Sequence, residues 1–267
     1  MIKYKKKAAS AAAALGFAAA FWPLGAWFSR RMADGGDEPY GLIVLGILTL
    51  LISRERRDLS SPASSWRFIA TAVSFVFYIL SVFWLPPMLR CVPAIFCLSF
   101  YYGWYRRAGW IALLFLSLPV VASLQFYLGY PLRLISTETT RWLVWPFVNE
   151  IVREGTTLTA YGKVVGVDPP CSGIRILWMG LIFTNILTSL VRMNWARTIV
   201  FNLFAIVLLL LSNSVRAALL FAPESGVIEI SDTLHESMGL LCYFTVVLIL
   251  IKVASLRRAA ISIRSSS

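Results

Sequence analysis

Three side chains that can carry out nucleophilic and proton-transfer chemistry lie at the edges of long apolar stretches. Cys171 lies in Asp168-Pro-Pro-Cys171-Ser-Gly-Ile-Arg175, directly before one stretch. Arg216 lies inside a second, and His235, the only histidine, begins a third. A thiol reacts as its thiolate, and a helix N-terminus or a nearby cation lowers its pKa. An imidazole can accept that proton and return it to a leaving amine, and a guanidinium can stabilise an oxyanion. Together the three predict a thiol-based peptide-processing site.

Four further residues are predicted to support this chemistry. Arg175 follows Cys171 by four residues, so its charge would favour the thiolate if the segment is helical. Asn213 precedes Arg216 by three residues on the same helical face and could orient it or add a donor. Ser172 and Gly173 are small, which would give a substrate access to the thiol.

The two arginines among these residues also have a purely structural interpretation. An arginine inside an apolar span costs roughly 2.5–3.5 kcal/mol on insertion scales and is functional by default, but Arg216 could also extend toward water from a position near the surface. Arg175 could simply pair with Asp168 or Glu236. The remaining cysteines have no zinc-like spacing, so we expect buried apolar roles for them and no metal site: Cys91, Cys97 and Cys242.

The composition indicates that these residues belong to a polytopic membrane protein. The 267 residues are 58% hydrophobic and 14% charged, with a mean hydropathy of +0.74, whereas soluble domains carry about 25% charged residues. We expect an all-α bundle of about eight transmembrane spans, forming a single integral membrane domain over residues 1–267. The apolar stretches cover 8–28, 39–53, 67–87, 91–105, 108–128, 172–191, 198–221 and 235–252.

The positions of the basic residues predict the orientation of these spans. With both termini in the cytoplasm, cytoplasmic segments hold about two thirds of the 25 lysine and arginine residues, as the positive-inside rule requires. The net charge of +12 therefore needs no nucleic-acid partner. The apolar run that follows the basic N-terminus reads as an uncleaved anchor rather than a signal peptide, since about 20 residues can span. In this orientation Cys171, Arg216 and His235 reach the outer face of the plasma (inner) membrane, the periplasmic or extracellular side, at one depth.

The one long loop, 129–170, also lies outside in this topology. Arg133 to Val152 carries apolar residues at helical spacing with interspersed tryptophans, which is typical of a helix lying in the membrane interface. Thr156 to Val167 alternates β-branched residues with glycines and predicts a short β ribbon. Pro169 and Pro170 would then deliver Cys171 to the start of a helix.

These motifs resemble the exosortase/archaeosortase family of membrane transpeptidases. The resemblance is carried by Cys171-Ser-Gly173 with Ile174-Arg175, then Asn213-x-x-Arg216, then His235-x-x-x-Gly239, in the family's order. It implies Cys171 as nucleophile, His235 as general acid/base and Arg216 as electrophilic stabiliser, with no cofactor. The implied substrates are secreted proteins that end in a recognition motif, a transmembrane helix and a basic tail. The acyl group would pass through a thioester to a lipid or cell-surface amine, or to water.

Two other classes of function remain open from the sequence. A transporter could use Arg175 and Arg216 to line a path for an anionic solute, although it would need polar residues through the bundle, whereas here they gather at one edge. A non-catalytic scaffold for polysaccharide or secretion machinery would need no closeness between Cys171 and His235. The oligomeric state is not predicted.

Overall fold

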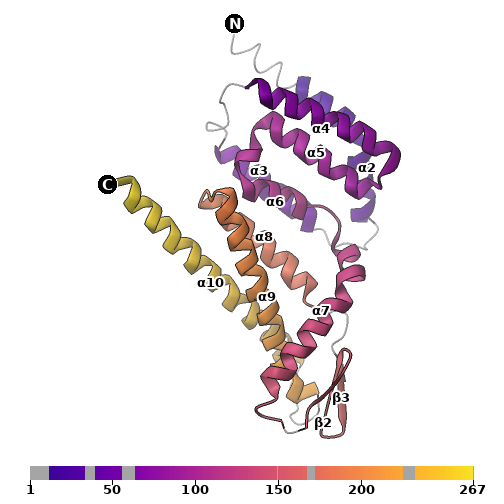
Figure 1. Cartoon of the computed structure of the whole chain (residues 1–267), viewed down its shortest axis with the longest axis vertical. Coiled ribbons are helices and arrows are strands. Elements are labelled where there is room, and N and C mark those ends of the chain that lie inside the picture. Colours follow the sequence, from indigo (N-terminus) through magenta and orange to yellow (C-terminus); the bar gives the residue numbers. More distant parts are fainter. Residues whose placement is uncertain are drawn as a thin grey trace. The chain divides into compact units, whose positions relative to one another are not determined.

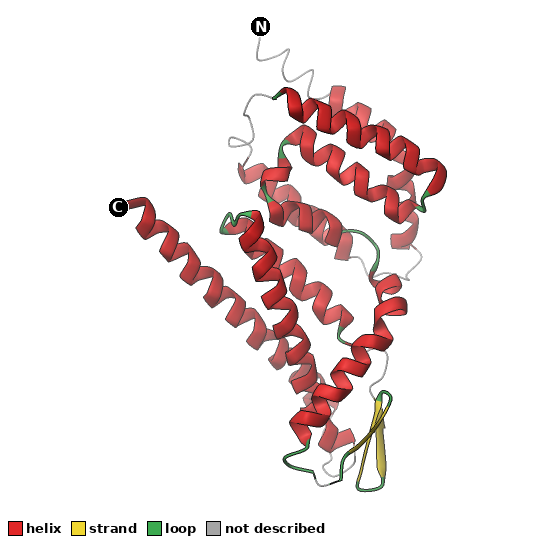
Figure 2. Cartoon of the chain, in the orientation of Figure 1, coloured by secondary structure: helices red, strands yellow, loops and turns green. Residues whose placement is uncertain are grey.

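The computed structural model is mostly helical, with one small sheet (Figures 1 and 2). It describes residues 12–33, 40–55, 64–148, 150–166, 172–224 and 232–266, with only the backbone at 222–224, 232–236 and 257–266. After a helix over Ala12–Ala20, the elements are α2 (Trp22–Ala33), α3 (Tyr40–Glu55), α4 (Ser65–Trp84), α5 (Pro87–Tyr102), η1 (Trp104–Arg106), α6 (Ala108–Leu116), α7 (Val121–Val144), β1 (Val152–Glu154), β2 (Thr157–Ala160), β3 (Lys163–Gly166), α8 (Ile174–Leu190), α9 (Trp195–Glu224) and α10 (Asp232–Ser266).

The chain divides into two compact units, and the first contains residues 1–106 and 117–120. Its helices α4 and α5 pack together, and a buried arginine joins them. Arg67, in the first turn of α4, donates to the backbone oxygens of Phe100 at 3.2 Å and Tyr101 at 2.7 Å, in the last turn of α5. The last carbonyl groups of a helix have no partner within it, so Arg67 satisfies two of them. The chain therefore contains two compact units, and the single integral membrane domain expected over residues 1–267 stays a prediction.

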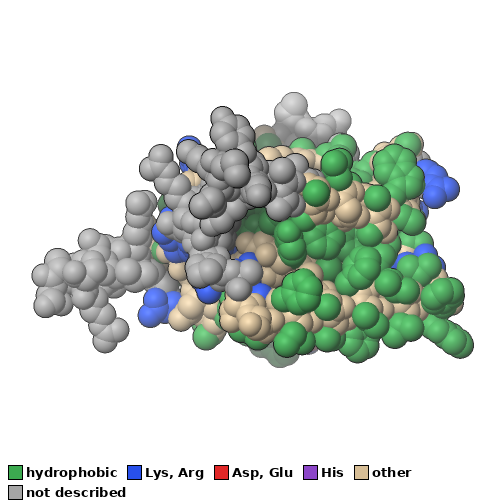
Figure 3. All heavy atoms as spheres, turned by 90° about the horizontal axis from the view of Figure 1, so that it is seen from above, with side chains coloured by type: hydrophobic (Ala, Val, Ile, Leu, Met, Phe, Trp, Pro, Cys, Tyr) green, Lys and Arg blue, Asp and Glu red, His purple; other side chains and the backbone are tan. Residues whose placement is uncertain are grey.

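The surface of the first unit is strongly apolar. Hydrophobic side chains cover much of the face in view in Figure 3. On α4 the exposed side chains include Phe68, Phe77, Phe83 and Trp84. Soluble proteins rarely expose an apolar surface of this extent to water, whereas a membrane protein exposes such a surface to lipid. The structure is thus that of a membrane protein.

The second unit contains residues 107–116 and 121–267 and is built on α8, α9 and α10. Its apolar core joins α9 and α10, with Phe201, Leu209 and Leu250 among the buried side chains. On α8, Gly180 faces Leu209 so closely that a side chain there would collide with it. A glycine at this point lets the two helices approach, as small residues do between membrane helices.

A buried polar cluster lies between α8 and α9, away from the start of α8. Asn185 donates to Asn202 Oδ1 at 2.8 Å, and Asn202 donates back to Asn185 Oδ1 at 3.1 Å. The nearby hydroxyls of Thr188 and Ser189 donate to the backbone oxygen of Asn185. Such interhelical hydrogen bonds join membrane helices. The prediction that polar residues gather at one edge of the bundle was therefore wrong, although these groups bond to each other and to their own helix.

The sheet is a three-stranded antiparallel meander in the order β1-β2-β3. Leu158 of β2 pairs with Val165 of β3, and both are buried. They pack with Val144 at the end of α7 and Phe221 near the end of α9. The sheet therefore lies against the end of the unit where α7 and α9 finish.

The structure corrects three predicted boundaries. The stretch 108–128 is not one helix, because α6 ends at Leu116 before Pro119 and α7 then turns by 92°. The stretch 8–28 is likewise two helices, which meet at 62°. The interfacial helix expected over 133–152 begins earlier and ends at Val144, since Pro146 stops it. The expected ribbon is confirmed as β2 and β3, and β1 was missed.

Among the described helices, fewer than eight have the length and composition of a membrane span. Of the described helices, three are long and apolar enough to cross a membrane: Ser65–Trp84, Trp195–Phe221 and Ser237–Leu256. The number rises to five if each bent pair is one span. Helices α5 and α8 are apolar but shorter, with 16 and 17 residues. The count of eight stays a prediction.

Candidate functional site

The candidate residues belong to one end of the second unit, which we call the site end. It consists of the start of α8 (Ser172–Ile174), residues 212–221 of α9 and the first turns of α10 up to Cys242. Because α8 and α10 run antiparallel to α9, their beginnings lie beside its second half (Figure 1). Cys171 lies outside the described residues, and of His235 the structure describes only the backbone, in α10.

The residue after the predicted nucleophile is buried and bonded to another helix. The side chain of Ser172 is only 1% exposed, and its hydroxyl donates to Gln125 Oε1 on α7 at 2.9 Å. The Ser172 hydroxyl oxygen also accepts the backbone N–H of Ile174 at 3.5 Å, in the first turn of α8. This segment of the motif is thus held from two sides.

Gly173 brings the start of α8 directly against α9. Its φ of +80° is in the left-handed region, which favours glycine. A Cβ at this position would lie 2.9 Å from Asn213 Cγ and 3.0 Å from Asn213 Nδ2, too close for any real side chain. The predicted supporting residues Gly173 and Asn213 are therefore in contact, one turn before Arg216.

A second close approach joins Arg216 to α10. A Cβ at Gly239 would lie 3.1 Å from Arg216 Nε and 3.8 Å from its Cζ, so the guanidinium lies over this glycine. One turn further along, Ser212 Oγ donates to the backbone oxygen of Cys242 at 3.0 Å. Gly239 follows His235 by four residues, which places both on one face of α10. Helix α10 thus contacts Arg216 at Gly239, one turn after His235.

The environment of Arg216 differs from that of an arginine extended into water. Its side chain is half-buried, and Nε is enclosed without a hydrogen-bond partner among the residues that the structure describes. Arg175, in contrast, is exposed in the first turn of α8. The partners considered for it cannot be compared, because Asp168 lies outside the described residues and Glu236 is described only by its backbone.

Helix α7 supplies polar contacts that the sequence did not predict as part of the site. Besides Gln125, it provides Ser136, whose hydroxyl accepts from Asn213 Nδ2 at 3.1 Å, and Thr140, whose hydroxyl donates to the backbone oxygen of Ser214 at 3.3 Å. Gly129, Ser136 and Thr140 are buried. Their spacing, with Gln125, follows one helical stripe. That stripe is the sequence signal that could have identified α7.

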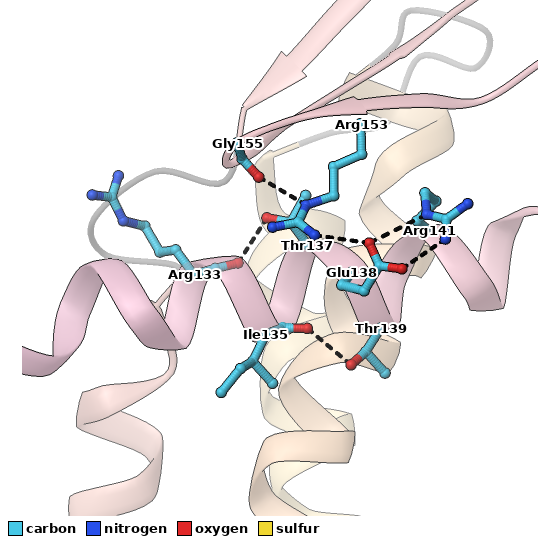
Figure 4. Close-up of polar contacts among 8 residues, drawn as sticks. All are labelled: Arg133, Ile135, Thr137, Glu138, Thr139, Arg141, Arg153 and Gly155. Carbon is cyan, nitrogen blue, oxygen red and sulfur yellow. Dashed lines mark hydrogen bonds and ion pairs between the residues drawn. The ribbon is translucent and has the colours of Figure 1, made fainter.

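An ion-pair network joins α7 to the sheet (Figure 4). Glu138 bonds Arg141 on its own helix at 2.6 Å and Arg153 of β1 at 2.9 Å, and Arg153 also donates to the backbone oxygen of Gly155. The hydrogen bond from Arg141, reinforced by that from Arg153, lowers the pKa of the Glu138 carboxyl to about 2. The sheet and α7 thus form one support beside the site end.

The described residues hold no cluster of three or more histidine, cysteine or acidic side chains arranged to bind a metal ion. The groups present can instead bind and polarise a carbonyl through arginine and amide donors.

Comparison with known protein families finds a match that covers most of the chain. The model of the transmembrane exosortase family matches residues 27–252, which is most of the chain and includes the whole site end. No curated protein and no solved structure matches the chain.

Proposed function

Because the chain belongs to the transmembrane exosortase family, we propose that it is a membrane cysteine peptidase or transpeptidase. Its substrates are secreted proteins that carry a C-terminal sorting signal: a short recognition motif, a transmembrane helix and a basic tail. The reaction takes place at the outer face of the plasma (inner) membrane, with both termini of the chain in the cytoplasm.

In the proposed reaction Cys171 is the nucleophile. Its thiolate attacks the carbonyl carbon of the scissile peptide bond, and His235, having taken the thiol proton, returns it to the leaving amine as the C–N bond breaks. Arg216 stabilises the oxyanion of the tetrahedral intermediate. The acyl group is then held on sulfur as a thioester, until an amine, a lipid or water attacks it and releases the thiol.

The observation that carries this proposal is a pair of contacts at the site end. Gly173, two residues after Cys171, touches Asn213, and Arg216, one turn after Asn213, lies over Gly239 of the His235 helix. Two separate close approaches therefore join α8, α9 and α10, the helices that carry Arg175, Arg216 and His235, and Gly173 at the first of them is two residues after Cys171.

The test is processing of a co-expressed substrate with the three-part C-terminal signal. We expect Cys171→Ala and Cys171→Ser to leave the chain folded in the membrane and to abolish cleavage, because neither replacement supplies a thiolate. Cys242→Ala is the matched control, since this cysteine lies on α10 within one turn of Gly239, and it should leave processing unchanged. Normal cleavage by the Cys171→Ala chain would refute the nucleophile assignment.

A further inference from the structure

We propose that Gln125 is a positioning residue for the nucleophile, which holds Ser172, and with it the peptide carrying Cys171, at the start of α8. This inference rests on the proposed function and deepens it, since Gln125 acts on the same site from a helix outside the predicted set.

The contact between Gln125 and Ser172 is direct and largely shielded from water. The Ser172 hydroxyl donates to Gln125 Oε1 at 2.9 Å, and the Ser172 side chain is 1% exposed. A hydroxyl buried in this way cannot exchange its partner for water without cost. Ser172 is joined to the proposed nucleophile by one peptide bond, and neighbouring Cα atoms are about 3.8 Å apart, so this is the contact through which α7 would act on Cys171.

Gly129 makes room for the Gln125 side chain on α7. A Cβ at Gly129, one turn later, would lie 3.0 Å from Gln125 Nε2 and 3.4 Å from Cδ, so the glutamine side chain lies along the helix over this glycine. A larger residue at 129 would displace it. Gly129 thus leaves the space in which the Gln125 amide lies where it meets Ser172.

The same helix is bonded to the helix of Arg216. Ser136 and Thr140 of α7 bond Asn213 and the backbone of Ser214, within three residues of Arg216. One helix therefore contacts Ser172 through Gln125 and the arginine helix through Ser136, on either side of Pro131. Through these contacts α7 joins the start of α8 to the part of α9 that carries Arg216, and a reaction of this kind needs its groups held to within a fraction of an ångström.

The experiment measures the rate of Cys171 alkylation against pH in the full chain, with labelled peptides separated by mass spectrometry, alongside substrate processing. The variants are Gln125→Met, which keeps length but loses the amide oxygen, Ser172→Ala, and the double variant. Thr139→Val is the matched control, because Thr139 also lies on α7 but its hydroxyl bonds only Ile135 of its own helix. Thermal unfolding of each chain is recorded in parallel.

We expect each single variant to shift the alkylation midpoint to higher pH and to reduce processing about 10-fold, with melting lowered only as far as the loss of one buried hydrogen bond requires. The double variant should show little more than the larger single effect, because both single changes remove the same bond between Ser172 and Gln125. Unchanged midpoints, or additive effects, would overturn the positioning role. A midpoint shift in chains whose wild type cleaves no substrate would retain the positioning role and reject the proposed function.

Discussion

At the scale of single residues, Gly173 carries two constraints that act independently. Its φ of +80° strains any residue with a Cβ, and the space beside it is already filled by Asn213. The first constraint concerns the backbone alone, whereas the second concerns the contact between α8 and α9. A comparison among glycines separates them, because the chain has other glycines with positive φ in open surroundings.

We predict that Gly173→Ala destabilises the folded chain more than Gly162→Ala. Gly162 has a φ of +74° and nothing within 4 Å of an added Cβ, so its alanine variant measures only the backbone cost, about 1–2 kcal/mol. The additional loss at Gly173 reports the collision with Asn213. Thermal or denaturant unfolding in detergent gives both values, and Gly173→Ala together with Asn213→Ala should lose less than the sum. Equal losses at the two glycines would show that the close approach does not hold in the folded chain.

The types of the residues were enough to select candidates from the sequence, but not to predict which residues contact each other. Cysteine, arginine and histidine are conspicuous at the edges of apolar stretches because each is costly there, and so they could be selected from the sequence. The contact of Gly173 with Asn213 joins residues forty positions apart and depends on helix packing. Gln125 could not be selected, because a single glutamine in an apolar segment looks the same whether it bonds water, its own helix or Ser172.

At the scale of elements, the link between α7 and β1 depends on the ionisation of one carboxyl. The Glu138 pKa falls from its ordinary 4.5 to about 2 because Arg141 and then Arg153 stabilise the charged form. A depressed folded-state pKa means that the stabilisation is complete above pH 4.5 and is lost as the pH falls toward 2.

We therefore predict that the stability difference between wild type and Glu138→Gln is largest at neutral pH and narrows between about pH 4.5 and 2. Thermal unfolding of the detergent-solubilised chains across this range measures it. Thr139→Val, an uncharged change on the same helix, is the control, and its difference from wild type should stay constant. A Glu138→Gln difference that does not change with pH would mean that the network contributes nothing to folding.

At both ends of α7 the hydropathy pattern predicts a longer helix than the positions of the prolines allow. The apolar run from 108 to 128 looks continuous because hydropathy ignores Pro119, yet the chain turns by 92° there. The tryptophan-rich pattern that suggested a helix to residue 152 continues past Pro146, where the helix has already ended. In both places proline, which lacks an N–H and restricts the residue before it, determined the boundary.

At the scale of the whole molecule, hydropathy identified the membrane class but not the number of crossings. All eight apolar stretches include helix in the residues that the structure describes, but α5 and α8 have only 16 and 17 residues. A straight crossing of the hydrocarbon core, about 30 Å thick, needs about 20 residues at 1.5 Å each. Composition alone cannot distinguish a short span from a helix that ends within the membrane.

Helix α9 offers the clearest test of orientation because it is long enough to cross without ambiguity. Its apolar part, Trp195–Phe221, has 27 residues and is therefore about 40 Å long. Ala196 is exposed in its first turn, and the sheet that carries the exposed Lys163 packs against Phe221 near its other end. These two positions must lie on opposite sides if α9 spans.

We predict that Lys163→Cys reacts with a membrane-impermeant maleimide in intact cells, whereas Ala196→Cys reacts only after permeabilisation. The background replaces Cys91, Cys97, Cys171 and Cys242 by alanine, so each chain has one thiol. The direction follows from Arg192 and Arg197, which flank the start of α9 and favour the cytoplasm. Labelling of both positions from outside would show that α9 does not cross. The reverse pattern would place the site end in the cytoplasm, where secreted substrates do not reside, and would remove the basis for the proposed reaction.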